Sequence, residues 1–230
     1  MADKAKKTPG HLGHRKRLRE RFLKSGAQAL ADYELLELLL FTAMPRRDTK
    51  PVAKALLKRF GTVGEVVAAE PPALREVDGV GDAVVTALKS VEAVALHMLS
   101  DQIKGRNVLT SWAKLEDYLM AAMARKKREH FRILFLNRQN ELIADEEQQR
   151  GTVDHTPVYP REVVARALEL GATALVIVHN HPSGDPTPSR GDIDMTSEIQ
   201  DAGQKLGITL HDHVIVSRRG LSSFKSLGLL

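Results

Sequence analysis

The sequence predicts a two-domain protein of mixed α/β class, with an all-helical half before a half that combines strands and helices. No strand signal precedes residue 106. After that point, apolar or alternating runs bounded by turn residues indicate strands at 130–137, 141–149 and 173–180. A chain of 230 residues is long enough for two small domains. We therefore expect a basic, disordered tail and two domains, at 1–13, 14–100 and 106–230.

The composition excludes several classes of site. The chain has no cysteine, so disulfides and thiolate metal sites are excluded, and a metal would have to be held by His, Asp or Glu. No run approaches the roughly 18 apolar residues that a membrane span needs, and no apolar stretch near the N-terminus resembles a secretory signal. We expect a cytoplasmic protein with no membrane partner.

The positive charge is concentrated at the N-terminus. Residues 1–24 hold nine Lys or Arg against two Asp or Glu, a balance of +7, so the rest carries −2 of the formal net charge of +5. A basic arm of this kind either contacts a polyanion such as nucleic acid or forms a solvated tail.

Capping signals divide the first half into helices. A helix over about 14–24 comes first. Asp32 is placed to cap the apolar segment YELLELLLFTAM, and Asp48 to cap a third helix. Thr62 and Glu65 have the spacing of a capping box for a fourth helix.

The segment ALREVDGVGDAVVTALKSVEAVALHML, at 73–99, predicts a short helix, a glycine turn and a long helix. It resembles the hairpin of helix-hairpin-helix DNA-binding modules. In such a hairpin, backbone N–H groups, here those of Gly79, Val80 and Gly81, hold a phosphate without contacting bases. Asp82 departs from this pattern, because an acid would repel phosphate; it would instead cap the long helix. The alternative is a helical turn inside a packed domain.

The second half begins after a linker predicted at 100–111. Helices are expected over about 111–126, 160–170 and 189–206. Beyond the strands named above, strands are expected at 150–159 and in two short pieces, separated by a bend, within ITLHDHVIVS at 208–217.

The strand at 173–180 leads into His179, and His181 follows two residues later. Because alternate residues of an extended segment point the same way, the two imidazoles can converge on one point. Asp192 lies one turn into the next helix, where it can face the histidines. Two His and one Asp leave one position of a tetrahedral zinc ion open for water, as in catalytic sites, where the water has a pKa of about 7. The sequence therefore predicts one zinc ion held by these three residues.

A purely structural interpretation accounts for the same residues one at a time. Ser189-x-x-Asp192 has the spacing of a helix capping box, and a histidine at a strand end is commonly a polar cap. The joint pattern of strand, H-x-H, seven residues, Ser, two residues, Asp and helix favours the metal site. The Ser189 side chain can serve both as a cap and as a donor to a reacting oxygen.

The pattern His179-x-His181, seven residues, Ser189, two residues and Asp192 matches the JAMM motif of the JAB/MPN metalloproteases. The longer string HNHPSGDPTPS, with GTVDHTPVYPREVVARAL before it and DHVIVS after it, resembles the RadC family of bacterial proteins. The resemblance runs from about residue 14 to the end and is most specific over 151–192. It implies a mixed-sheet JAB/MPN fold, which is cytidine-deaminase-like, for the second domain.

The resemblance also implies roles for single residues. His179, His181 and Asp192 would be the zinc ligands, and Ser189 would help to stabilise the oxyanion of a tetrahedral intermediate. An upstream glutamate would take a proton from the zinc-bound water and later return it to the leaving group.

Glu129 holds the place expected for that glutamate, because it opens the strand that precedes the H-x-H strand. Glu146 and Glu147, in the following strand, are competitors. Glu162 is a further one, although its place in the first turn of a helix suits an N-terminal charge. Outside an active site, Glu129 would be an ion-pair partner of the basic run at 125–128.

A second H-x-H, His211-Asp212-His213, lies at the predicted strand bend, with no carboxylate following at suitable spacing. Asp212 or His213 would orient a metal ligand, or the segment is a polar strand end. The letters HNH also occur in the name of a nuclease class, but its residues are spread over a longer ββα unit, so we set that interpretation aside.

The leading functional hypothesis is a zinc-dependent metallopeptidase or isopeptidase of JAMM type that acts on a peptide or protein. The alternative is a DNA-associated, repair-type factor whose helical half binds DNA. A third is a non-catalytic scaffold, in which a structural zinc would be closed by a fourth protein ligand.

Overall fold

The computed structural model describes residues 10–150 and 158–230. The chain divides into two compact units between Ala95 and Leu96, within one long helix. Each unit has its own hydrophobic core, so we describe them separately.

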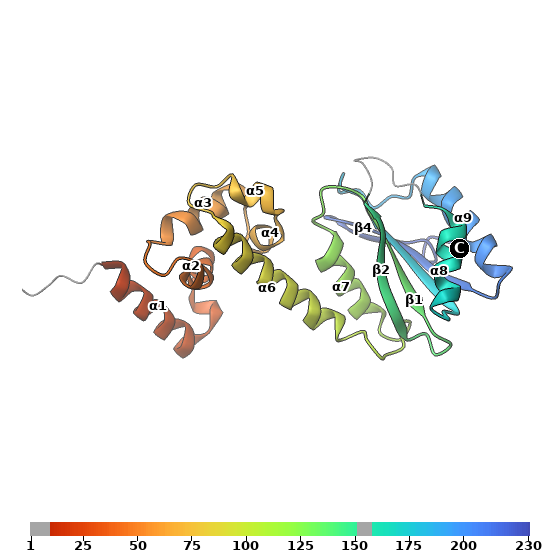
Figure 1. Cartoon of the computed structure of the whole chain (residues 1–230), viewed down its shortest axis with the longest axis horizontal. Helices are drawn as coiled ribbons and strands as arrows, with labels where there is room; N and C mark the ends of the chain where they lie inside the picture. Colours follow the sequence, from red (N-terminus) through yellow and green to blue (C-terminus); the bar gives the residue numbers. More distant parts are fainter. Residues whose placement is uncertain (1–9, 151–157) are drawn as a thin grey trace, which may run out of the picture. The chain divides into compact units, whose positions relative to one another are not determined.

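The helical unit contains the elements predicted for the first half of the chain (Figure 1). Its helices are α1 (Gly10–Ser25), a 3-10 turn (Ala27–Ala29), α2 (Asp32–Ala43), α3 (Lys50–Phe60), α4 (Val63–Ala68), α5 (Pro71–Arg75) and the first part of α6 (Asp82–Ser100). No strand occurs in this unit over residues 10–95, as the sequence predicts.

The capping predictions hold for one helix and fail in detail for two. Thr62 caps α4, with its hydroxyl accepting from the Glu65 N–H at 3.2 Å. Asp32 is the first helical residue of α2, and Ala31 occupies the N-cap position. Thr49 is the N-cap of α3, while Asp48 accepts from the Lys50 N–H from one position earlier. Both predictions were wrong by a single residue, because an acid on either side of the N-cap is also favourable at a helix N-terminus.

A buried arginine caps the C-terminal end of α2. Arg15 lies in α1 and is only 7% exposed. Its guanidinium donates to the carbonyls of Met44 and Arg47, each at 2.5 Å, to that of Pro45 at 2.8 Å and to that of Phe41 at 3.4 Å. Carbonyls at a helix C-terminus have no partner within the helix. The Arg15 guanidinium alone therefore satisfies these four carbonyls and fixes the 45–47 segment. Part of the basic arm is therefore structural.

By length and mean hydropathy, α6 is the one helix among the described residues that could cross a membrane. A single helix of this kind is weak evidence for a span, since core helices pass the same test. Its first half supplies Val84, Val85 and Leu88 to the core of the helical unit. Leu99, near its end, packs against the core of the second unit. The predicted absence of any such segment was too strict, and α6 contributes residues to the cores of both units.

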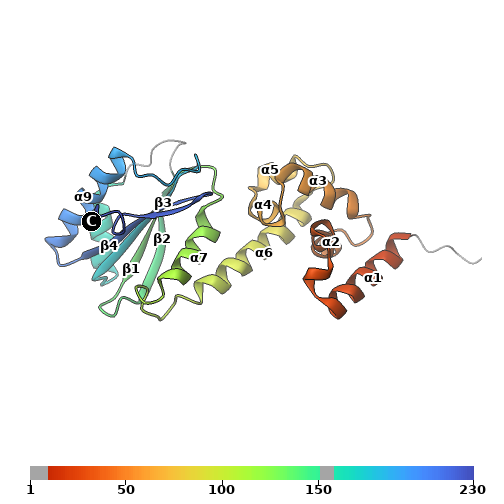
Figure 2. The same ribbon diagram turned by 180° about the vertical axis from the view of Figure 1, so that it is seen from behind.

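The second unit is a five-stranded mixed sheet covered by helices on both faces (Figure 2). The strands lie in the order β2-β1-β3-β4-β5, with β3 and β4 parallel and the other neighbours antiparallel. The elements are α7 (Trp112–Met123), β1 (His130–Leu136), β2 (Leu142–Arg150), α8 (Pro160–Glu169), β3 (Ala174–Asn180), α9 (Arg190–Gln204), β4 (Thr209–Ser217) and β5 (Gly220–Ser223). The predicted mixed α/β class is confirmed.

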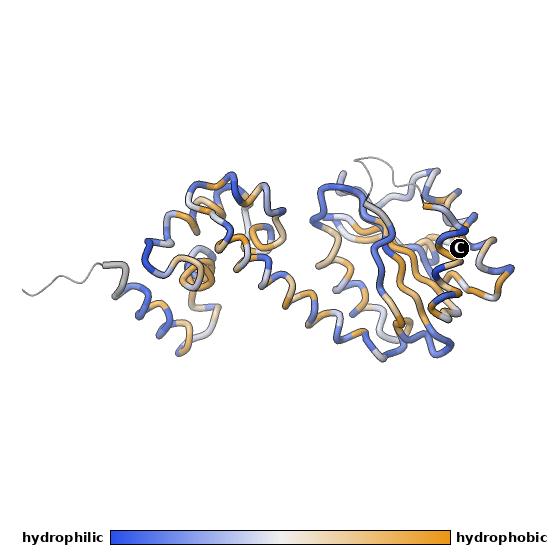
Figure 3. Tube along the Cα trace, in the orientation of Figure 1, coloured by the Kyte–Doolittle hydropathy of each residue, from blue (hydrophilic) through white to orange (hydrophobic). Residues whose placement is uncertain are grey.

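Two cores sandwich the sheet. Alternate residues of the strands pack with α7 on one face, and the intervening residues pack with α8 and α9 on the other. β3, the middle strand, is buried at all seven positions, which explains the apolar run that precedes His179. Figure 3 shows hydrophobic residues along the central strands and hydrophilic ones in the surrounding turns.

The segment predicted as a linker, 100–111, belongs to the second unit. Ile103 and Val108 are fully buried in its core, and the Val108 N–H donates to the Asn140 carbonyl at 2.8 Å. The linker prediction was wrong because the polar residues between these two apolar positions face outward, so the composition resembles that of a loop.

β4 is one continuous strand rather than the predicted two pieces with a bend. A register shift stands where the bend was expected: Leu175 of β3 pairs with Leu210, but Val176 pairs with Asp212. His211 is therefore an extra residue, a β-bulge. The bulge places His213 opposite Ile177, on the same face of the sheet as His179.

Two predictions fall partly or wholly on residues that the structure does not describe. Of the predicted disordered tail, residues 1–9 lie outside the described chain, whereas α1 already begins at Gly10. The strand predicted at 150–159 lies largely on 151–157, also outside the described residues.

Candidate metal centre

The site lies at the C-terminal end of β3, where the strand passes through a nine-residue turn into α9. His179 is the last but one residue of β3, and His181 follows it. The loop back to α9 is shaped by Gly184, which has a positive φ of 88°, and by Asp185, whose carboxylate accepts from the Thr187 N–H and hydroxyl. This path brings Asp192, in the first turn of α9, in front of both histidines.

The three predicted ligands converge. His179 Nε2 lies 2.9 Å from His181 Nε2 and 3.2 Å from a carboxylate oxygen of Asp192, whose other oxygen is 3.5 Å from His181 Nε2. Among the described residues, these three form the one group of His and acidic side chains arranged to hold a metal ion, with ligand atoms within 4.8 Å of one another.

The other ring nitrogens are already engaged. His181 Nδ1 lies 2.8 Å from the Asp185 carbonyl, which can only accept, so Nδ1 carries a proton. His179 Nδ1 lies 2.7 Å from Nε2 of His213. The two Nε2 atoms thus face each other across the site with a carboxylate beside them. Two imidazoles and one carboxylate form the N/O donor set that suits zinc, so the residues present fit the ion.

Asp192 is both a helix cap partner and a candidate ligand. Ser189 is the N-cap of α9: its N–H and its hydroxyl each donate to Asp192 Oδ2 at 2.7 Å, and its Oγ accepts from the Asp192 N–H at 3.2 Å. The capping box and the metal ligand set therefore share a residue, and the two interpretations of this sequence do not compete.

Charge at the site is biased toward binding a cation. Burial alone raises the pKa of the Asp192 carboxyl, but hydrogen bonds from His179 and His181 outweigh it and hold the pKa well below its usual range. The hydrogen bond to Asp192 raises the pKa of His181 against the effect of burial, with a smaller contribution from the Glu129 carboxylate. Asp192 is thus an anion that attracts a positive charge to this point.

Glu129 is at the same edge of the sheet. It immediately precedes β1, whose Phe131 pairs with His179 in the antiparallel register. Continuing that register by two residues places Glu129 opposite His181. The electrostatic effect of Glu129 on His181 agrees with this position. Glu129 is partly exposed, so a substrate approaching the histidines would reach it.

Asn180 holds the segment that carries Glu129. Its side chain is 1% exposed. Its Oδ1 accepts from the His130 N–H at 2.9 Å, and its Nδ2 donates to the carbonyls of Arg128, at 3.0 Å, and Lys126, at 3.4 Å. One amide thus binds the backbone on both sides of Glu129, and sequence reasoning missed it. The available signal was a polar residue at the end of a wholly apolar strand.

The competing glutamates lie elsewhere. Glu146 accepts two hydrogen bonds from Arg166 of α8, at 2.6 and 2.9 Å, and this pairing lowers its pKa. Glu147 lies 2.8 Å from Nδ1 of His130. Glu162 is in the first turn of α8, mostly exposed and paired with Arg161. None of these contacts involves the two histidines of the site.

The second H-x-H is divided between different tasks. His211 Nε2 lies 2.7 Å from the Asn140 side chain, at the end of the sheet opposite the candidate metal site. Asp212 accepts from the Ser223 hydroxyl and the Lys225 N–H, so it anchors the β4–β5 hairpin. Only His213 contacts a candidate ligand. Burial, with the neighbouring His179, holds the pKa of His213 well below its usual value.

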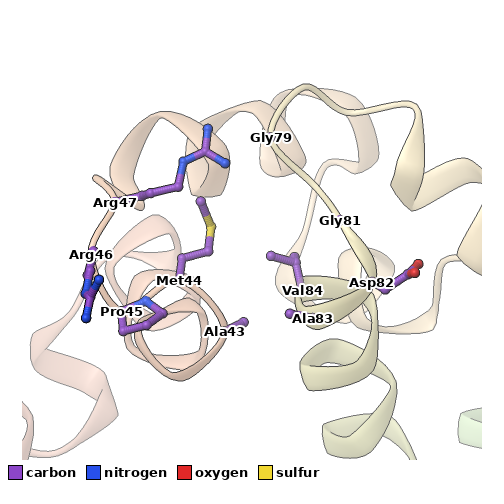
Figure 4. A pocket seen from close by; sticks show the side chains of 10 residues that line it. All are labelled: Ala43, Met44, Pro45, Arg46, Arg47, Gly79, Gly81, Asp82, Ala83 and Val84. Atoms are coloured by element: carbon purple, nitrogen blue, oxygen red, sulfur yellow. The ribbon is translucent and has the colours of Figure 1, made fainter.

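A second candidate site lies in the helical unit. A cavity of about 560 Å³ is bounded on one side by the end of α2 and the 45–47 segment, and on the other by the glycine turn and the start of α6 (Figure 4). Arg46 and Arg47 are exposed on the first wall, and Gly79 and Gly81 form part of the second. We call this space the arginine cavity.

The predicted phosphate contacts are placed unequally. Gly79, with a φ of 85°, and Gly81 line the arginine cavity. Val80 does not: it is 8% exposed, belongs to the core, and its N–H donates to the Val77 carbonyl at 3.0 Å. The prediction of three N–H donors is therefore wrong for Val80, because the tight turn uses that donor internally.

Asp82 obstructs this cavity less than its sequence position suggests. Its carboxylate accepts from Arg75 at 2.9 and 3.0 Å, and Figure 4 shows it pointing away from Arg46 and Arg47. The negative charge is thus matched on the far side of the turn.

Comparisons with known proteins agree with this division of the chain. The RadC-like JAB domain family matches residues 109–229, and the UPF0758 N-terminal family matches residues 11–86. A UPF0758 protein of Rhodobacter capsulatus is 59% identical over 213 residues, which cover 93% of this chain and the whole of that protein.

Proposed function

Because the chain belongs to the RadC family and its second unit is a RadC-like JAB domain, we propose that it is a zinc-dependent hydrolase of amide bonds in peptides or proteins. The observation that carries the proposal is the convergence of His179, His181 and Asp192 at an accessible end of the sheet. Within the described residues this group offers three protein ligands, whereas a structural zinc site would be closed by four.

A zinc ion held by these three side chains supplies the Lewis acidity that activates water and polarises a carbonyl. His181 Nδ1 donates to the Asp185 carbonyl, so that ring presents the lone pair of Nε2 to the ion. His179 has His213 beside its Nδ1, and its Nε2 faces the same point. The Asp192 carboxylate compensates the charge.

Glu129 is the proposed general base and acid. As a C–O bond forms to the substrate carbonyl, its carboxylate accepts the proton of the attacking water. When the C–N bond breaks, the same proton passes to the leaving nitrogen, and the products are a carboxylate and an amine. The placement opposite His181 and the clamp of Asn180 support this role.

Ser189 is the proposed oxyanion donor. It is exposed at the start of α9, beside Asp192. Its hydroxyl donates to Asp192 Oδ2, so the O–H must turn away from Asp192 to reach a reacting oxygen. The Ser189 N–H continues to hold Asp192 while the hydroxyl turns.

The first experiment measures metal content and hydrolysis together. We expect the purified full chain to bind one zinc ion, and His179→Ala combined with His181→Ala to lose both metal and hydrolysis of isopeptide-linked and linear fluorogenic peptides. A wild-type chain that binds no zinc, or a double variant that hydrolyses as fast as wild type, would contradict the proposal.

The substrate can be sought with Glu129→Gln, which should retain zinc but stall the chemistry. Proteins that co-purify with this variant and not with wild type are substrate candidates, and each is then tested for cleavage by wild type. This variant also decides between Glu129 and the other glutamates, because a wrong assignment leaves the cleavage rate unchanged.

A second function, suited to a repair-type factor, is binding of the phosphate backbone of DNA by the arginine cavity. The observation that favours it is that Arg46 and Arg47 line the same cavity as a glycine turn that opens onto the N-terminus of α6. Such a contact positions DNA without selecting its sequence.

Its test is binding of a fluorescent DNA duplex to the full chain across a salt series. A phosphate contact predicts affinity that falls linearly with salt on a logarithmic scale. Absence of binding at low salt would remove this function. A cytoplasmic location suits both functions and can be checked by cell fractionation.

A further inference from the structure

We propose that Thr196 and His213 act as positioning residues that fix the tautomer of His179, so that its Nε2 lone pair is directed at the metal. This inference rests on the proposed metal site. It adds two residues that contact neither metal nor substrate and that nothing in the ligand pattern itself identifies.

The three side chains form a continuous row behind the site. His179 Nδ1 lies 2.7 Å from His213 Nε2, and His213 Nδ1 lies 2.6 Å from Thr196 Oγ1. The Thr196 hydroxyl then donates to the Asp192 carbonyl, one helical turn earlier, at 2.5 Å. The row therefore begins at one candidate ligand and ends on the backbone of another.

The last member gives the row its direction. A backbone carbonyl can only accept, so the Thr196 proton is directed at Asp192, and its Oγ1 must accept from His213. His213 then carries its proton on Nδ1 and accepts on Nε2. His179 must in turn donate from Nδ1, which leaves a lone pair on Nε2 of the neutral ring that would hold the metal. The reverse order would set two acceptors, Thr196 Oγ1 and the Asp192 carbonyl, against each other.

Burial makes this row of side chains favour one tautomer of each histidine. His213 is 0% exposed and Thr196 2% exposed, so water is not at hand to satisfy either ring nitrogen in the other tautomer. Phe224 stacks on the His213 ring with centroids 4.4 Å apart, which fixes the plane of the imidazole. The β-bulge at His211 brings this ring to the face of His179.

Thr196→Val isolates the hydroxyl with little change of volume. It removes the acceptor for His213 Nδ1–H and so favours the tautomer in which Nε2 of His213 donates to His179. His179 would then carry its own proton on Nε2, where the metal binds. Loss of an outer partner of a metal-ligating histidine weakens metal affinity by about 10–100-fold. Thr196→Ser keeps the hydroxyl and is the matched control.

The first measurement is zinc affinity of the full chain, by competition with a chelating dye. We expect Thr196→Val to bind zinc about 10–100-fold more weakly than wild type, and Thr196→Ser to stay close to wild type. Thermal unfolding of the metal-free variants shows whether a loss of zinc affinity arises from misfolding. Equal affinities for a folded Thr196→Val and wild type would overturn the inference.

The second measurement needs no variant to fold and no metal. Nitrogen-15 shifts of labelled histidines in the metal-free wild type, at about pH 8, above the ordinary histidine pKa, report which nitrogen of each ring carries the proton. We expect protons on Nδ1 of both His179 and His213. A proton on His179 Nε2 with Nδ1 bare would overturn the inference. If these tautomers are found but wild type binds no zinc, the proposed function fails and the positioning row stands.

Discussion

The candidate metal centre and the arginine cavity use charged groups in opposite ways. At the metal centre, the candidate ligands are 15% exposed or less, and each is held by side-chain or backbone partners. At the arginine cavity, Arg46 and Arg47 are exposed, and the fixed element is the backbone beneath them, held by the buried Arg15. One region fixes the functional atoms themselves, and the other fixes only the segment that carries them.

This difference corresponds to two kinds of task. Breaking a covalent bond requires reacting groups placed to within a fraction of an ångström, since a misplacement of about 1 Å can cost about 100-fold in rate. A phosphate backbone is attracted over longer distances and tolerates flexible side chains. Variants at the metal centre should therefore cause steep losses, and variants at the arginine cavity graded ones.

The largest effect should come from Glu129→Gln. Removing the proposed base while keeping its shape should lower the turnover number about 100- to 10,000-fold, the usual contribution of general acid–base catalysis. Zinc content should not change. Single-turnover cleavage of the trapped substrate measures the rate, and Glu146→Gln serves as the control. Loss of rate in the control but not in Glu129→Gln would reverse the assignment.

The next effect should come from Asn180→Ala. Without its clamp, the 126–130 segment no longer holds Glu129 in one place, and we expect a turnover number lower by about 10–100-fold with KM little changed. Ser217→Ala removes another fully buried polar side chain from the same sheet, away from this segment, and is the matched control. Equal effects of the two variants would reduce Asn180 to a general contribution to stability.

Arg15→Met tests the scaffold of the arginine cavity. The variant keeps an apolar stem but removes the guanidinium, and hydrogen bonds to a charged group contribute about 1.5–3 kcal/mol. We expect the free energy of unfolding of the helical unit to fall by that amount, as measured by urea denaturation. Arg17→Met, on an exposed position of α1, should change it by less than about 0.5 kcal/mol. A stable Arg15→Met would show that the 45–47 segment holds itself in place.

The smallest effect should come from Arg46→Ala. Loss of one phosphate contact should reduce the slope of log affinity against log salt by about 0.9. Lys58→Ala removes the same charge from an exposed position of α3 outside the cavity and should leave the slope unchanged. Identical slopes for both variants would place the DNA contact elsewhere on the basic surface.

Local signals predicted most elements and the ligand set, because both depend on residues close together in the chain. Thr62 and Ser189 cap helices through contacts three residues apart. β3 is apolar up to His179 because it is buried on both sides. His179 and His181 are placed by strand geometry alone.

Several of the failures involve contacts between distant segments. Nothing near Ile103 indicates that its partners lie in the sheet. The N–H of Val80 is a local exception, because it donates to the Val77 carbonyl three residues earlier. Asn180 acts on backbone 50 residues earlier in the chain, so its role follows only from the antiparallel pairing of β1 with β3.

The bulge at His211 has a consequence for how the family could be surveyed. β4 matches β3 only because one residue, His211, is left out of the pairing. The same residues paired without the bulge would set Asp212 opposite Ile177 and turn His213 to the opposite face of the sheet. Deleting His211 would remove the extra residue and leave His213 opposite Ile177. A relative one residue shorter at this point would therefore keep the inner support of the site in a regular strand, so a comparison of relatives should allow a gap here.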